Sequence, residues 1–217
     1  MLSTTALTAV LAVDETKDAF SHGDTAWVLA SAALVLFMTP GLAFFYGGMV
    51  RVKSVLNMLM MSFVTIGIVS VLWTLYGFSM AFGITGNGFF GGFKWIGMGE
   101  ALHLLDTANG ATYNIPTLAF SMFQLMFAII TPALISGAIA DRAKFLGWSV
   151  FVALWVTIVY FPVAHWVFDF GGVTADNTAG WLAKRGVEDF AGGTAVHINA
   201  GAAGLALCII IGRPHRR

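Results

Sequence analysis

Five long apolar stretches, each free of charged residues, constrain this sequence more than any other feature. A run of about 18 or more such residues can cross a hydrocarbon core of about 30 Å as an α-helix. All eleven acids and all eleven lysines and arginines lie outside the five stretches. The sequence therefore predicts an all-α integral membrane protein with five transmembrane helices. We place them at residues 26–50, 54–83, 115–140, 146–168 and 190–212.

The rest of the chain divides around this five-helix unit of residues 26–212. Residues 1–25 are expected to form an external N-terminal segment, of which residues 1–13 are apolar and resemble a weak signal sequence. Residues 213–217 form a basic tail. A composition of 58% hydrophobic and 10% charged residues excludes an ordinary soluble domain. The alternating pattern of a membrane β-barrel is absent from the sequence.

Charged residues are divided unequally between the two sides that five spans would create. One side holds ten acids and only four bases, whereas the other holds one acid, Asp141. The bases on that second side are Arg51, Lys53, Arg142, Lys144, Arg213, Arg216 and Arg217. Short loops rich in lysine and arginine mark the cytoplasmic side. We therefore expect a multi-pass protein of the cell membrane with its N-terminus outside and its C-terminus in the cytoplasm.

The fifth span begins with the motif "DFAGGTAVHINAG", residues 189–201, which places two titratable groups close together. Asp189 precedes the apolar run, where it can accept hydrogen bonds from the first helical turn. His197 follows eight residues later, about 12 Å deeper if the segment is helical. An ionisable group inside a membrane is a candidate functional residue, because burying it is costly. Gly193, Gly201 and Gly204 share its expected stripe, so another backbone could approach closely there.

Aromatic residues line one face of the third span. Phe120, Phe123 and Phe127 recur at helical spacing, and Gln124 lies on the same side. Such a stripe usually reflects helix packing. It could also form a hydrophobic constriction whose ring faces attract a cation.

His165 and Trp166 lie at the outer end of the fourth span, where aromatic residues at the membrane interface are common. We interpret His165 as an interfacial or packing residue rather than a ligand. The loops contain no metal-ligand cluster, nucleotide-binding glycine loop or nucleophile–base pair. We therefore expect no enzymatic activity, no cofactor and no nucleic-acid partner.

Several stretches together resemble the ammonium transporter family (Amt/Mep/Rh), in the order in which the family has them. They cover residues 33–51, 73–83, 123–145, 160–168 and 189–201. The resemblance implies transport of ammonium or ammonia across the lipid bilayer through a hydrophobic pore, in a homotrimer with one pore per subunit. It also implies a possible nitrogen-regulatory protein partner on the cytoplasmic face.

The resemblance assigns roles to individual residues. Phe123 would lie beside an external aromatic site that recruits ammonium, and Phe127 would be one ring of the gate below it. Asp189 matches the acid near the entrance, and His197 matches the first of two paired pore histidines. Phe168 stands where the family commonly has a tryptophan, which implies weaker recruitment, whereas Trp166 on a helix would point elsewhere.

Family members resemble inverted repeats of five spans each plus a final helix, eleven in all. This sequence matches only the first half, so the partner histidine and the second gate ring belong to the half that is not matched. The expected function is ammonium transport by a partial transporter. The alternative is a non-conducting relative that acts as an assembly or sensing subunit, or is inactive.

Overall fold

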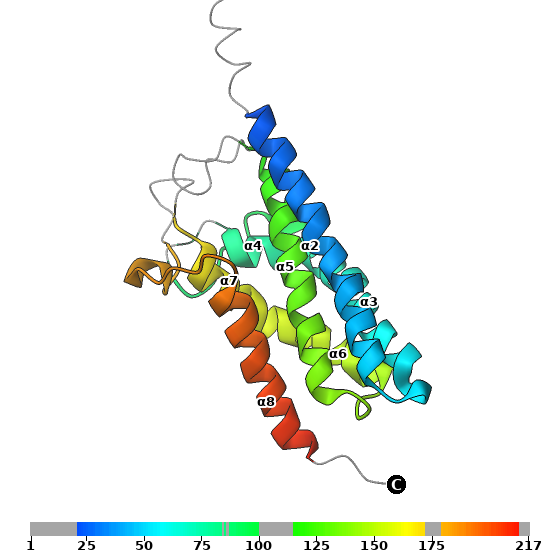
Figure 1. The fold of residues 1–217 in the computed structure, drawn as a ribbon. Helices are drawn as coiled ribbons and strands as arrows, with labels where there is room; N and C mark the ends of the chain where they lie inside the picture. Colours follow the sequence, from blue (N-terminus) through cyan, green and yellow to red (C-terminus); the bar gives the residue numbers. More distant parts are fainter. Residues whose placement is uncertain (1–20, 84, 86, 100–114, 172–178, 213–217) are drawn as a thin grey trace, which may run out of the picture.

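A computed structural model describes residues 21–83, 85, 87–99, 115–171 and 179–212 of the chain. Within these residues, five helical spans are long and apolar enough to cross a membrane (Figure 1). The prediction of an all-α protein with five membrane spans is confirmed. The spans are His22–Met49, Val52–Phe82, Thr117–Ile139, Phe145–Phe168 and Gly193–Ile211. The signal-like stretch 1–13 and the tail 213–217 lie outside the described residues.

Each span is built from one or more helical segments. The first is α2 (His22–Met49), which starts four residues before the predicted 26 because the Ser21 side chain accepts a hydrogen bond from the Asp24 amide. The second joins η1 (Val52–Ser54), α3 (Val55–Leu72), η2 (Trp73–Gly77) and α4 (Phe78–Phe82). The third joins α5 (Thr117–Ser136) and η5 (Gly137–Ile139). The fourth joins α6 (Phe145–Trp155), η6 (Val156–Tyr160) and α7 (Phe161–Phe168). The fifth joins η8 (Gly193–Ile198) and α8 (Asn199–Ile211). Short 3₁₀ turns, η3 (Ile96–Met98) and η7 (Ala183–Arg185), lie in the connections.

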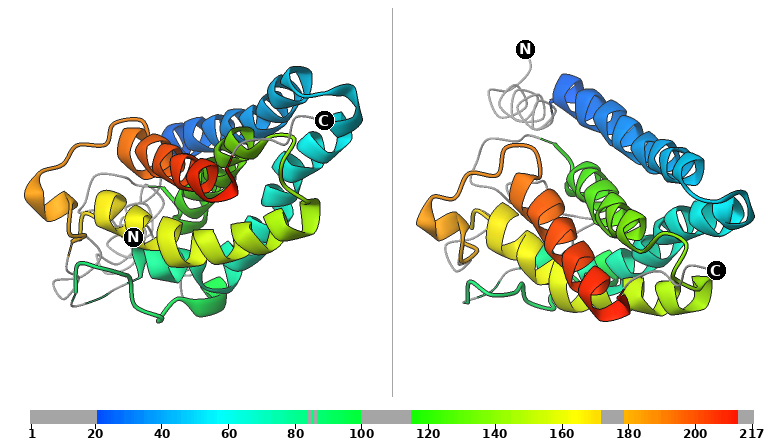
Figure 2. Two further views of the ribbon diagram at one scale, coloured as in Figure 1. Left: turned by 90° about the horizontal axis from the view of Figure 1, so that it is seen from below. Right: turned by 60° about the horizontal axis from the view of Figure 1, so that its bottom comes forward.

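Helix α5 occupies the centre of the bundle. It packs against α2, α3 and α8, and Figure 2 shows it between α2 and α8. In the span that contains α5, 61% of the most apolar part is buried inside the bundle. The corresponding share is only 17% for α2 and 22% for the span that contains α8. Most of α2 and α8 therefore faces lipid or other protein surface rather than this bundle.

Aromatic rings fill the core between the second and fourth spans. Phe161 is fully buried and its ring lies edge-on to the rings of Trp73 and Tyr76. The space for it exists because Gly77 has no side chain: a Cβ atom there would lie 2.5 Å from the Phe161 ring. The close approach of these two spans depends on this glycine.

Within the described ranges, three segments are π-helical: η2, η6 and η8. The first two face each other, because the hydroxyl groups of Tyr76 in η2 and Thr157 in η6 lie 2.8 Å apart. Single π-helical turns inside α-helices are uncommon and often occur at functional sites. The third, η8, carries His197.

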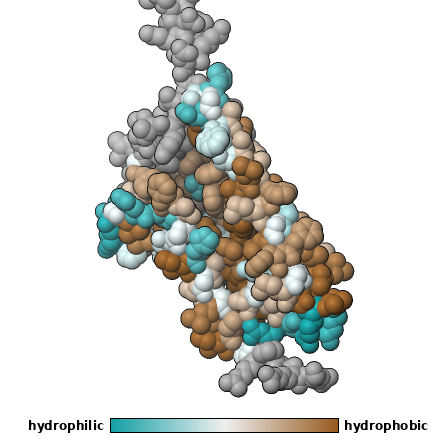
Figure 3. All heavy atoms as spheres, in the orientation of Figure 1, coloured by the Kyte–Doolittle hydropathy of each residue, from teal (hydrophilic) through white to brown (hydrophobic). Residues whose placement is uncertain are grey.

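In Figure 3, hydrophilic residues gather at the top, at the left edge and at the lower right of the described molecule, and apolar residues dominate the surface between them. At the end where α2 and α5 finish, the loop residue Arg51 donates a hydrogen bond of 3.2 Å to Asp141. A hydrogen bond from Ser54 and the Arg51 guanidinium lower the pKa of Asp141 below its ordinary value of 3.8. A lowered pKa means that this carboxylate stabilises the fold above pH 3.8, and the contribution is lost as the pH falls through the pKa of the folded protein. The Arg51–Asp141 pair lies at the protein surface, so the contribution is at most a few tenths of a kcal/mol.

The backbone conformation of Asp141 lowers the stability of the fold, because its φ of 62° lies in the left-handed region. Alanine tolerates this region poorly, whereas glycine adopts it freely. We expect Asp141→Ala to be less stable than Asp141→Gly by about 1 kcal/mol, although both lose the same ion pair. The free energy of unfolding of the two purified variants in detergent checks this order. Equal stabilities would mean that the loop relaxes out of the left-handed conformation.

Candidate functional site

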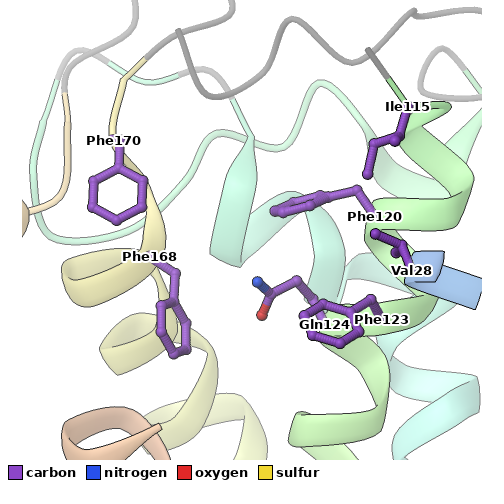
Figure 4. Close-up of a pocket in the computed structure, with 7 residues that line it drawn as sticks. All are labelled: Val28, Ile115, Phe120, Phe123, Gln124, Phe168 and Phe170. Carbon is purple, nitrogen blue, oxygen red and sulfur yellow. The ribbon is translucent and has the colours of Figure 1, made fainter. Parts of the chain in front are cut away.

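A pocket of about 210 Å³ opens between the N-terminal part of α5 and the C-terminal end of α7. Figure 4 shows Phe120, Phe123 and Gln124 entering it from α5, and Phe168 facing them from α7. Its wall is mostly aromatic and carries no charged side chain. The lining residues are Val28, Ile115, Phe120, Phe123, Gln124, Phe168 and Phe170. The structure thus brings together two of the predicted site residues, Phe123 and Phe168, and adds Phe170 and Gln124.

Phe127 lies one helical turn below this pocket on α5. Its ring packs edge-on against the ring of Phe123, with 5.0 Å between centroids and planes 80° apart. The Phe127 carbonyl accepts a 2.6 Å hydrogen bond from the Thr131 hydroxyl, which also bonds to the buried Tyr160 side chain. Phe127 is therefore held both through its ring and through its backbone.

The start of η8 is fixed by Asp189 and Gly192. Gly192 has a φ of 80°, and its carbonyl accepts hydrogen bonds from the amides of Val196 and His197. Asp189 Oδ2 accepts 2.9 Å hydrogen bonds from the amides of Thr194 and Ala195. The interpretation of Asp189 as a helix cap is confirmed. The second oxygen, Oδ1, is buried and has no hydrogen-bond partner among the described residues.

The expected depth of about 12 Å between Asp189 and His197 assumed a continuous helix from Asp189, and that condition is not met. The helix begins at Gly193, so only part of the intervening segment is helical. The Asp189 side chain also reaches the amide of Ala195, two residues before His197. Along the helix axis, the Asp189 carboxylate therefore lies closer to His197 than it would if all eight intervening steps were helical.

His197 lines an open groove of about 400 Å³ between α8 and the lower halves of α2 and α5. Tyr46 enters this groove from α2, and its hydroxyl donates a 3.0 Å hydrogen bond to the Leu134 carbonyl. The groove is otherwise apolar on the α5 side. Its lining residues are Tyr46, Leu134, Ile135, Ala138, His197, Ala200, Gly201, Gly204, Leu205 and Cys208.

The predicted glycine stripe is correct in part. Gly201 and Gly204 line the groove with His197, and a Cβ atom at Gly204 would lie 3.1 Å from Ala138. Gly193 is not among the lining residues. The π-helical turn changes the number of residues per turn between Gly193 and His197, so α-helical spacing does not hold there.

Trp166 and His165 lie apart from the pocket. The Trp166 indole donates a 2.6 Å hydrogen bond to the Phe89 carbonyl and packs edge-on against Trp181. His165 is fully buried, with Nδ1 2.9 Å from the Ala81 carbonyl and 3.2 Å from Asp169 Oδ2. Of the two expected roles, interfacial or packing, its complete burial favours packing. Within the described residues, no group of three or more His, Cys, Asp or Glu side chains could hold a metal ion.

Sequence reasoning missed Tyr46, which lines the groove, and Thr131, whose hydroxyl bonds to the Phe127 carbonyl. Hydroxyl groups inside apolar spans were the available signal, because each must find a hydrogen-bond partner there. Gln124 was noted on the aromatic face, but its place in a pocket was not predicted.

Comparisons with known proteins agree on one relationship. A family model described as "Ammonium Transporter Family" matches residues 26–217. The chain is similar to an ammonium transporter of Mycobacterium tuberculosis, with 57% identity over 204 residues, covering 88% of this chain and 43% of that protein.

Solved structures give the same result. The crystal structure of Candida albicans Mep2 is similar, with a TM-score of 0.78 and 31% identity, covering 90% of this chain and 40% of that one. So is a structure described as "Sensor Amt Protein", with a TM-score of 0.76 and 28% identity, covering 87% of this chain and 44% of that one. The chain thus spans less than half the length of the relatives that it matches.

Proposed function

Because this chain belongs to the ammonium transporter family, we propose that it forms the first half of a path that carries ammonium or ammonia across the membrane. One observation carries the proposal. The aromatic pocket, the Phe127 ring and the His197 groove follow each other along α5, which contributes Gln124 to the first and Leu134 to the last. Residues at these spacings lie on one face of a helix, so the three features share one route.

We assign each residue a role on that route. Phe123 and Phe168 attract the cation to the outer pocket by their ring faces, more weakly than a tryptophan would. Phe127 closes the route below the pocket. His197 offers both a donor and an acceptor in the apolar groove, which suits passage of a small polar molecule or a proton. Trp166 shapes the outer loops rather than the route.

The other side of the route must come from protein surface beyond these five spans. His197 and Gly201 are exposed, and so is most of α8. In the proposed assembly the second half covers this groove, and three subunits associate in the cell membrane. The excess of basic residues at the end where α2 and α5 finish supports a cytoplasmic position for that end. A nitrogen-regulatory partner would dock there in the proposed assembly.

A second candidate is a non-conducting relative with an assembly or sensing role. It is favoured by the likeness to the structure described as "Sensor Amt Protein". The two candidates differ in whether substrate crosses the membrane.

Uptake of labelled methylammonium by cells that lack their own ammonium transporters tests the main proposal. We expect the five spans, assembled with the second half that covers the groove, to raise uptake above background, and His197→Ala in that assembly to reduce it at least about tenfold. A loss of 1.4 kcal/mol at the rate-limiting barrier gives a change of that size. The physical reason is that alanine leaves the groove without a titratable, hydrogen-bonding group.

Ile210→Ala is the matched control, because Ile210 is exposed on α8 and does not line the groove. This variant should take up methylammonium as the parent does. Background uptake by the parent at normal membrane levels would favour the non-conducting candidate. Parent-level uptake by His197→Ala would remove His197 from the route.

A further inference from the structure

Gln124 is the one polar side chain among the seven that line the outer pocket. Its carboxamide points away from α5 toward the side where Phe168 lies (Figure 4). The side chain makes no hydrogen bond within the part of the chain that the structure describes. A carboxamide in an apolar span would ordinarily be paired, because an unpaired polar group in such surroundings costs free energy.

Aromatic rings alone distinguish cations poorly. A ring face attracts any small monovalent cation that reaches it, whether or not that cation carries N–H groups. The carboxamide oxygen of Gln124 adds a directional acceptor, and hydrogen bonds from charged donors are the stronger kind. A site that uses such a bond rejects analogues that lack the donor, because its own polar group is then left unpaired.

We propose that Gln124 is a specificity-determining residue that makes the outer pocket prefer cations carrying N–H groups, such as ammonium and methylammonium, over quaternary ammonium ions. The proposal rests on the proposed function, since it names how that same route selects its substrate. In this proposal the ring faces attract any cation, and Gln124 discriminates between cations with and without N–H groups.

Competition in the uptake assay gives the first test. Leucine matches glutamine closely in size but cannot accept a hydrogen bond. Gln124→Leu should raise the apparent KM for methylammonium about tenfold. Inhibition of uptake by tetramethylammonium should keep its parent concentration dependence, because that ion uses only the rings. Met122→Leu, an exposed change two residues away on α5 and outside the pocket, should behave as the parent.

A second test does not require transport. Gln124 is the only glutamine in the sequence, so selective ¹⁵N labelling of glutamine side chains gives one carboxamide signal from the full chain in lipid nanodiscs. Ammonium chloride should shift this signal saturably, whereas sodium chloride and tetramethylammonium chloride at equal ionic strength should not.

The outcomes separate this proposal from the proposed function. If ammonium shifts the Gln124 signal but the parent shows no uptake, the role of Gln124 in binding is supported and the proposal that the route conducts is overturned. Uptake by the parent with an unmoved signal and an unchanged KM for Gln124→Leu would overturn the role of Gln124. An equal shift with tetramethylammonium, or equal weakening of both cations in Gln124→Leu, would also overturn it, since Gln124 would then not discriminate.

Discussion

Gly77→Ala is expected to lower the free energy of unfolding by about 3 kcal/mol, the upper part of the usual range for overpacking a core. The added Cβ atom would lie 2.5 Å from Cζ of Phe161 and within 2.9 Å of both Cε atoms. Phe161 is fully buried and surrounded by the rings of Trp73, Tyr76 and Tyr160, so it cannot move aside. Thermal unfolding of the purified chain in detergent, followed by tryptophan fluorescence, measures the loss.

Gly67→Ala is the matched control on the same span. No atom lies within 4 Å of a Cβ atom at Gly67, and alanine favours a helix by up to about 1 kcal/mol over glycine. This variant should be as stable as the parent or slightly more so. Adding Phe161→Leu to Gly77→Ala should recover part of the loss, because leucine lacks the clashing ring atoms. If the double variant were less stable than Gly77→Ala, the clash would not be the cause.

The positions of the spans could be predicted because length and the absence of charge report directly on a membrane crossing. The predicted 146–168 and the observed Phe145–Phe168 differ by one residue at the start. Larger differences occur where a local backbone feature sets the boundary. Ser21 extends α2 to His22, and the left-handed Gly192 delays the fifth span to Gly193.

The buried faces of the spans could not be predicted in the same way. Lipid-facing and protein-facing positions are both apolar, so hydropathy does not separate α5 at the centre from α2 at the edge. His165 illustrates the limit. Its carboxylate partner, Asp169, lies only four residues later in the sequence, but its carbonyl partner, Ala81, becomes a neighbour only when α4 and α7 pack together.

The candidate site was predictable in its residues and less so in its geometry. The aromatic spacing on the third span placed Phe123 near Phe127, and their rings do meet. Helical phase correctly separated Phe168, which lines the pocket, from Trp166, which does not. The π-helical start of the fifth span was not predictable, because it depends on how Gly192 and Asp189 share the free amides of the first turn.

Asp189→Ala is expected to lose both methylammonium uptake and stability. Two amides, of Thr194 and Ala195, would lose their acceptor at the start of the helix that carries His197. Loss of a helix cap costs up to about 2 kcal/mol in soluble proteins, and unpaired amides cost more where water is excluded. Thermal unfolding and uptake of the same variant measure the two effects.

Asp189→Asn separates the cap from the charge. Asparagine keeps an oxygen that can accept from the Thr194 and Ala195 amides, so the melting temperature should stay near that of the parent. The carboxylate charge is lost, however, and the buried Oδ1 of Asp189 has no hydrogen-bond partner among the described residues. For a cation about 10 Å away at an effective dielectric constant of about 20, that charge contributes about 1.7 kcal/mol, or a 15- to 20-fold change. We therefore expect Asp189→Asn to remain folded and to lose uptake by about this factor, whereas parent-level uptake would restrict Asp189 to capping the helix.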